Sequence, residues 1–330
     1  MEVSSLENLP PPPGIIDSIK AGFDAVASRI AAILLPVLLN LFLWLGPRLK
    51  MDALFTSMQN DMVTFWTALR IPAEDIQEML EGYGSFSQSA NLFGLVRTLP
   101  IGISSLFAGF NEPFTTPIGS PAALQVTEVN FSLWLMGLTV IGWVGGAIYF
   151  RSVAWAALTE KFKSPGLVRS VSQTILVSIA FNFVLMLIGI PVLMVIIIAA
   201  QFSAFLANLL VLFITLGSVL VIVPMFFWAH GVFIRQENVI TSMMSSIQLT
   251  RFTLPTSSLF ILTIFLLSYG LNFLWQMPKF DSWITVLGIF GHSFVTTALL
   301  AASFIYYHNM NIWVQLVLER LRPMNTVKQA

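Results

Sequence analysis

The feature that most constrains the fold is the absence of charge between Arg169 and Arg235. No Asp, Glu, Lys or Arg occurs over these 65 residues. As one α-helix the run would be roughly 95 Å long, against about 30 Å for the hydrocarbon core of a bilayer. The run therefore predicts more than one crossing of a membrane.

The composition agrees with this prediction and excludes several functional classes. Hydrophobic residues make up 56% of the chain and charged residues 10%, whereas a soluble domain carries about a quarter charged. The net charge is zero and no basic run occurs, so we expect no nucleic-acid partner. Because the chain has no cysteine, disulfides, thiolate metal sites and cysteine nucleophiles are excluded.

Four other charge-free runs are each long enough for one span. They are residues 30–47, 129–150, 252–278 and 282–318. The long run divides best at the short polar turn Gln201–Ala204, which gives helices near 172–200 and 205–229. The sequence therefore predicts an all-α integral membrane protein with six transmembrane helices.

The predicted organisation has five parts. They are an N-terminal tail and interfacial helix (1–29), a first span (30–47), an external loop (48–130), a five-span bundle (131–308) with an interfacial helix at 236–250, and a cytoplasmic C-terminal tail (309–330). The start of the chain has no early basic region of the kind that opens a signal peptide, so we expect the first span to be retained.

Lys and Arg set the expected orientation. With the N-terminus in the cytoplasm, the inner side receives Lys20, Arg29, Arg151, Lys161, Lys163, Arg169, Arg235, Arg251, Arg320, Arg322 and Lys328. The outer side receives Arg48, Lys50, Arg70, Arg97 and Lys279. We therefore expect both termini in the cytoplasm of a bacterial inner or plasma membrane.

Amphipathic patterns predict helices in the membrane plane and a cap outside it. Apolar residues recur at helical spacing at Ile15, Ile16, Ile19, Phe23, Val26 and Ile30, and again at Val239, Ile240, Met243, Met244 and Ile247. The external loop has a helical stripe from Met51 to Leu69 and a second helix between Pro72 and Gly82. Its apolar stretch Leu99–Phe110 is too short to span, so we expect an interfacial or re-entrant loop.

His292 is the one histidine well inside a predicted span. An ionisable group there is a candidate haem or pigment ligand or proton carrier. The alternative, favoured because no second spanning histidine stands at a helpful position, is a neutral side chain that bonds between helices. We accordingly predict no cofactor.

Four asparagines occur in four different predicted spans. Asn40, Asn182, Asn208 and Asn272 either line a polar pathway or, as we favour, bond between packed helices. No Asp or Glu occurs in any predicted span, which counts against proton- or sodium-coupled transport.

Two glycines and one serine are further candidates for packing or catalytic residues. Gly142 and Gly146 form a small-residue face that we expect to pack against another helix. Ser218 and His292 are the one pair that suggests an intramembrane hydrolase, but the glycine-rich context of such a serine is missing. We therefore predict that the protein is not an enzyme.

The stretch Val223–Thr253 carries a resemblance to a known family. Ser242, Ser246 and Arg251 stand where bacterial six-span proteins related to the membrane domain of glycerophosphoryl diester phosphodiesterases have an alanine, a serine and a basic residue. The resemblance implies a non-enzymatic membrane module, and no hydrolytic domain occurs in this chain.

The expected function is that of an accessory or scaffold protein. Its expected partners are membrane lipids and either another membrane protein or a second copy of the chain. The alternatives are a permease or flippase-like carrier for a neutral or lipidic substrate, and a pigment- or haem-binding subunit.

Overall fold

The computed structural model describes residues 11–107, 115–158 and 165–321. Within them, five helical segments are long and apolar enough to cross a membrane. They are α5 (Glu128–Ala157), α6 (Leu167–Phe202), α7 (Ala204–Phe226) with α8 (Trp228–Ile234), α9 (Val239–Gln276) and α10 (Thr285–Leu321). A bent pair, Ile15–Ser28 and Ile30–Leu45, makes a sixth if it is one span. The prediction of a largely helical protein with several such helices is confirmed.

The chain divides into two compact units, each assembled from segments that are distant in the sequence. Unit 1 comprises Met1–Ala32, Phe150–Ser268 and Thr297–Ala330. Unit 2 comprises Ile33–Tyr149 and Tyr269–Thr296. Helices α5, α9 and α10 therefore contribute one end to each unit.

Helix α1 (Ile15–Ser28) packs in unit 1 through small residues. Its buried residues are Ser18, Gly22 and Val26, which are spaced four residues apart and so lie on one face of the helix. A Cβ atom on Gly22 would lie 2.5 Å from the carbonyl oxygen of Ala298 in α10, so the two backbones touch. The sequence predicts an apolar face here, but one of its members, Ile16, is 81% exposed.

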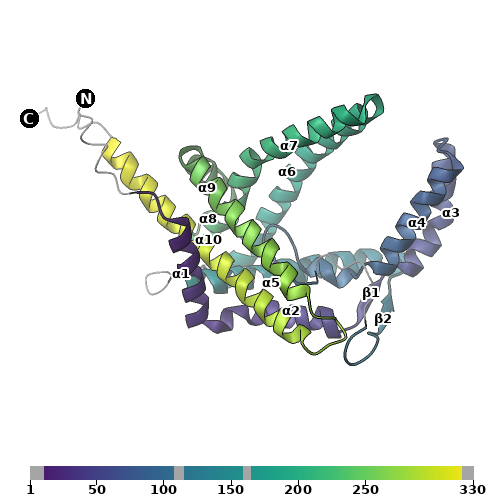
Figure 1. Ribbon diagram of the computed structural model, residues 1–330, viewed down its shortest axis with the longest axis horizontal. Coiled ribbons are helices and arrows are strands. Elements are labelled where there is room, and N and C mark those ends of the chain that lie inside the picture. Colours follow the sequence, from purple (N-terminus) through teal and green to yellow (C-terminus); the bar gives the residue numbers. More distant parts are fainter. Residues whose placement is uncertain (1–10, 108–114, 159–164, 322–330) are drawn as a thin grey trace, which may run out of the picture. The chain divides into compact units, whose positions relative to one another are not determined.

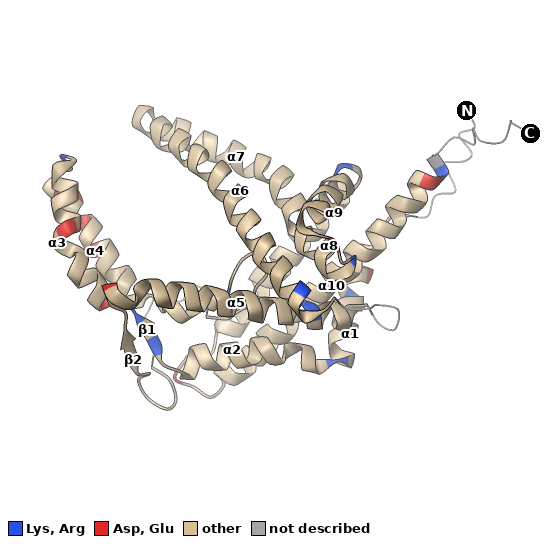
Figure 2. Ribbon diagram, turned by 180° about the vertical axis from the view of Figure 1, so that it is seen from behind, with Lys and Arg blue, Asp and Glu red and all other residues tan. Residues whose placement is uncertain are grey.

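Helices α6 and α7 form a long hairpin in unit 1 (Figure 1). Its turn lies at Ser203, within the polar break that the sequence predicts, because Ser203 has extended backbone angles (φ −167°). Most apolar side chains of the hairpin are exposed, and α7 has no charged residue along its length (Figure 2). An all-round apolar hairpin is the form expected for helices that face lipid.

Helix α9 is two helices joined at a kink. Thr253 has non-helical angles, two residues before Pro255, and proline removes a helical hydrogen bond. The first part begins at Val239 rather than at the predicted residue 236. Of its predicted apolar face, Ile240 and Met244 are exposed and Val239 is buried.

Helix α2 (Leu34–Leu45) follows a 3-10 turn, η2 (Ile30–Ile33), and leads in unit 2 to a small parallel sheet. Strand β1 (Arg48–Lys50) pairs with β2 (Ala123–Gln125), and Leu49 lies opposite Leu124. This short pair is an addition to the predicted helical fold. It joins the two ends of the predicted external loop, so α2 ends close to the start of α5.

The predicted cap contains a helical hairpin, α3 (Asp52–Ala68) and α4 (Ala73–Ser89), followed by a 3-10 turn, η3 (Leu92–Val96). Helix α4 begins after Pro72 as predicted. The predicted end at Gly82 is wrong, because the helix continues to Ser89. A glycine inside a helix costs only about 1 kcal/mol relative to alanine, so by itself it does not end one.

Helix α10 continues without a break past residue 308 to Leu321, so the first part of the predicted C-terminal tail (309–330) is helical. Lys161, Lys163, Arg322 and Lys328, which enter the predicted orientation, lie outside the described residues.

Candidate functional site

The candidate site in unit 2 is an irregular chain segment, residues 97–107, that is buried among helices. Ile101 and Leu106 are fully buried in it, and Ser105 is nearly so. The sequence predicts the apolar, non-spanning character of this stretch. Irregular backbone inside a membrane protein must have its polar groups satisfied by the protein itself, so its hydrogen-bond partners decide what holds it.

Asn40 of α2 is the main partner of this segment. Its side-chain oxygen accepts hydrogen bonds from the backbone N–H of Leu106 (2.7 Å) and from the Ser105 hydroxyl (2.9 Å). Its amide nitrogen donates to the Pro36 carbonyl (2.7 Å). Asn40 itself is fully buried. It therefore bonds α2 to the irregular segment.

Two further helices hold the segment by hydrogen bonds. The Ser104 hydroxyl donates to Thr296 Oγ1 in α10 (2.7 Å), and Thr296 donates to the His292 carbonyl (2.8 Å). The Gln276 side chain at the end of α9 donates to the Leu106 carbonyl (3.1 Å). The segment is thus fixed from α2, α9 and α10.

Helix α5 covers the same segment through its glycines. A Cβ on Gly142 would lie 2.6 Å from the Val96 carbonyl oxygen. A Cβ on Gly146 would lie 2.7 Å from the Ile101 carbonyl oxygen. The two glycines predicted to form a packing face therefore lie against backbone of their own chain. Gly146 lies against the irregular segment, and Gly142 lies against Val96, the last residue of η3.

His292 lies in α10 and is 5% exposed. Neither of its ring nitrogens has a hydrogen-bond partner among the described residues. Arg97 lies in the irregular segment of the same unit, and burial lowers the pKa of its guanidinium. Trp275 packs directly against Gly288 and Gly291. Gly288 lies about one helical turn before His292, and Gly291 is the residue immediately before it.

The other candidate residues are divided between the units. Asn272 lies in unit 2, and its buried side-chain oxygen has no hydrogen-bond partner within the described residues. Asn182 and Asn208 lie in unit 1, where Asn182 donates to Ser178 of its own helix (2.8 Å) and Asn208 is exposed. Ser218 belongs to unit 1 and His292 to unit 2. Neither unit by itself joins the four asparagines.

Unit 1 has its own buried polar core, which none of the sequence patterns above predicts. His230 is 2% exposed and packs against Phe227, Phe304 and Tyr307. Its Nδ1 lies 3.1 Å from the Phe226 carbonyl oxygen, and its Nε2 lies 2.7 Å from the Ser303 hydroxyl. A neutral ring with the proton on Nδ1 satisfies both contacts, since the carbonyl can only accept.

Two serines of α9 bond it to the end of α7 and to α8 within unit 1. Ser242 donates to the Trp228 carbonyl (2.6 Å), and Ser246 donates to the Pro224 carbonyl. Both side chains are fully buried. Their spacing of four residues places them on one helix face, which is a signal that could have identified this contact from the sequence.

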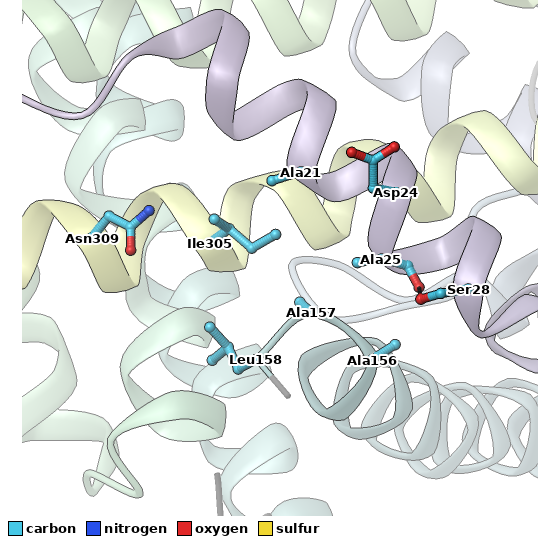
Figure 3. A pocket seen from close by; sticks show the side chains of 9 residues that line it. All are labelled: Ala21, Asp24, Ala25, Ser28, Ala156, Ala157, Leu158, Ile305 and Asn309. Carbon is cyan, nitrogen blue, oxygen red and sulfur yellow. Dashed lines mark hydrogen bonds between the residues drawn. The ribbon is translucent and has the colours of Figure 1, made fainter. Parts of the chain in front are cut away.

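A further pocket of about 470 Å³ lies in unit 1 between α1, the end of α5 and α10 (Figure 3). Its lining is dominated by small residues, with Asp24, Ser28 and Asn309 as the polar members. Across the described ranges, no group of three His, Asp or Glu residues could hold a metal ion.

A comparison of the chain with known protein families, curated proteins and solved structures finds no match.

Proposed function

We propose that the protein is a non-enzymatic accessory or scaffold protein of the bacterial inner or plasma membrane. The observation that carries this proposal is the filled core of unit 2. Helices α2, α9 and α10 hold residues 97–107 through side-chain hydrogen bonds, and α5 holds them through direct backbone contact at Gly146. Such packing favours a fixed framework over a pathway that must open, because packed interiors do not deform continuously.

The surface offered to a partner in this proposal is the hairpin of α6 and α7. Photo-crosslinking from a benzoylphenylalanine at Met194, which is 57% exposed, should give an adduct with a protein of defined mass in native membranes. The same group at Leu133, an exposed position of α5, is the control and should give mainly lipid adducts. Lipid adducts alone at both positions would contradict the scaffold proposal.

The second candidate is a carrier for a neutral or lipidic substrate. The observation that favours it is His292, whose buried ring nitrogens have no partner within the described residues. An unpaired buried polar group is costly and marks a functional site inside a membrane. Translocation of a fluorescent phospholipid by reconstituted protein, lost in His292→Leu, would replace the scaffold with the carrier.

The proposed topology has six spans, both termini in the cytoplasm, and α3 and α4 outside. The inner side of the membrane receives most of the Lys and Arg. Single cysteines at Ser85 in α4 and at Thr241 in α9, both exposed, should react with an impermeant maleimide from opposite sides, Ser85→Cys from outside. Labelling of both from one side of intact cells would rule out this topology.

A further inference from the structure

A second pocket in unit 1 has the chemistry of a phosphate site. It measures about 490 Å³ and lies between the first part of α9 and the end of α10. Its polar lining consists of Arg235, Arg251, Ser245, Gln248, Asn311 and Gln315. Its apolar lining includes Leu249, Phe252 and Leu318, and no Asp or Glu lines it.

The two arginines of the pocket differ in their hydrogen-bond and ion-pair partners. Arg235 is held by Glu237 (Nε to Oε1, 3.1 Å) and by the Asn311 side-chain oxygen (3.3 Å). Ser245 donates to the other carboxylate oxygen of Glu237 (2.7 Å). Arg251 is exposed and has no hydrogen bond or ion pair with any residue that the structure describes. Its charge is therefore available to a ligand.

The position of this pocket favours a lipid as the source of the phosphate. Arg235 ends the charge-free run of residues 170–234, and Arg251 immediately precedes the charge-free run of residues 252–278. Both guanidinium groups thus stand where apolar spans meet the polar membrane surface. Phe252, 62% exposed, and Leu318, 41% exposed, provide apolar surface at the same pocket, which suits an acyl chain but offers nothing to a free phosphate.

We infer that this pocket binds the phosphate group of an anionic phospholipid, with Arg251 as the main contact. A guanidinium binds phosphate oxygens with two parallel hydrogen bonds, and basic pockets between membrane helices bind anionic headgroups. Gln248 and Gln315 supply neutral amide donors beside it. The inference requires that the protein lies in a membrane, but it holds for a scaffold or a carrier alike.

The test uses the full-length protein in detergent, with bound lipid measured by native mass spectrometry during titration with dioleoyl-phosphatidylglycerol. We expect Arg251→Gln to weaken binding about tenfold, the effect of losing roughly 1.4 kcal/mol. Arg251→Lys should keep part of the affinity, because it keeps the charge but not the bidentate geometry. Lys20→Gln, an equal change of charge at an exposed position of α1 outside the pocket, should leave binding unchanged.

Three outcomes would overturn the inference. Equal binding by the original protein and Arg251→Gln would remove the proposed contact. Equal binding of dioleoyl-phosphatidylcholine would show that the headgroup charge is not recognised. Displacement of the lipid by inorganic phosphate at low millimolar concentration would assign the pocket to a soluble phosphate instead.

Discussion

Gly146→Leu should lower the stability of the protein in detergent by about 3 kcal/mol or more. The added Cβ alone would lie 2.7 Å from the Ile101 carbonyl oxygen and 3.0 Å from Gly102 Cα. These are backbone atoms of a segment fixed by hydrogen bonds to three helices, so they cannot move aside without breaking those bonds. Overpacking of a filled core typically costs 1–3 kcal/mol, and more where backbone must shift.

The matched control for this change is Gly137→Leu. Gly137 lies in the same helix, but nothing stands within 4 Å of the Cβ position. The two variants therefore differ in packing and not in helix propensity. Thermal unfolding followed by tryptophan fluorescence should show a lower midpoint for Gly146→Leu alone, and equal midpoints would show that α5 does not pack on the irregular segment.

Asn40→Leu should be the second severe change. Leucine has a similar size but cannot accept the hydrogen bonds of Leu106 N–H and Ser105 Oγ. Both donors are buried, and a buried group without a partner costs about 1–3 kcal/mol, so we expect a loss of about 2–6 kcal/mol. The destabilisation should appear in thermal unfolding and as faster proteolysis between residues 97 and 107.

Asn208→Leu serves as the control for Asn40→Leu. Asn208 is an exposed amide of α7, and its replacement by leucine should leave the unfolding midpoint within error or raise it. If the two variants behaved alike, the hydrogen bonds of Asn40 would not be what holds the segment in place.

The sequence predicts those features that follow from local patterns. The turn near Ser203 and the helix that begins at Val239 come from charge and from apolar spacing, which depend only on neighbouring residues. The start of α4 after Pro72 comes from helix-start chemistry. The end of α4 is not predicted correctly, because Gly82 disfavours a helix by only about 1 kcal/mol and α4 continues past it to Ser89.

The candidate site could be predicted only in part from the sequence. Asn40, His292, Gly142 and Gly146 are recognisable as unusual residues inside apolar runs. In the structure, Asn40 bonds to Ser105 and Leu106, and Gly142 and Gly146 contact the backbone between Val96 and Gly102. All of these partners belong to a stretch without periodicity. Contacts between residues 40 and 106 or between 101 and 146 carry no local signal, so the sequence identifies the residues without identifying what they touch.

The pairing of β1 with β2 fixes an order of events during synthesis. Leu49 leaves the ribosome long before its partner Leu124, and at roughly 5–20 residues per second several seconds separate them. Residues 269–296, which complete unit 2, follow much later still. The hydrogen bonds that Thr296 and Gln276 make with Ser104 and Leu106 therefore form only after the rest of unit 2 has been made. A chain truncated before residue 269 also leaves Trp44 without the Phe280 carbonyl that accepts its indole hydrogen bond, so unit 2 is complete only when residues 269–296 have been made.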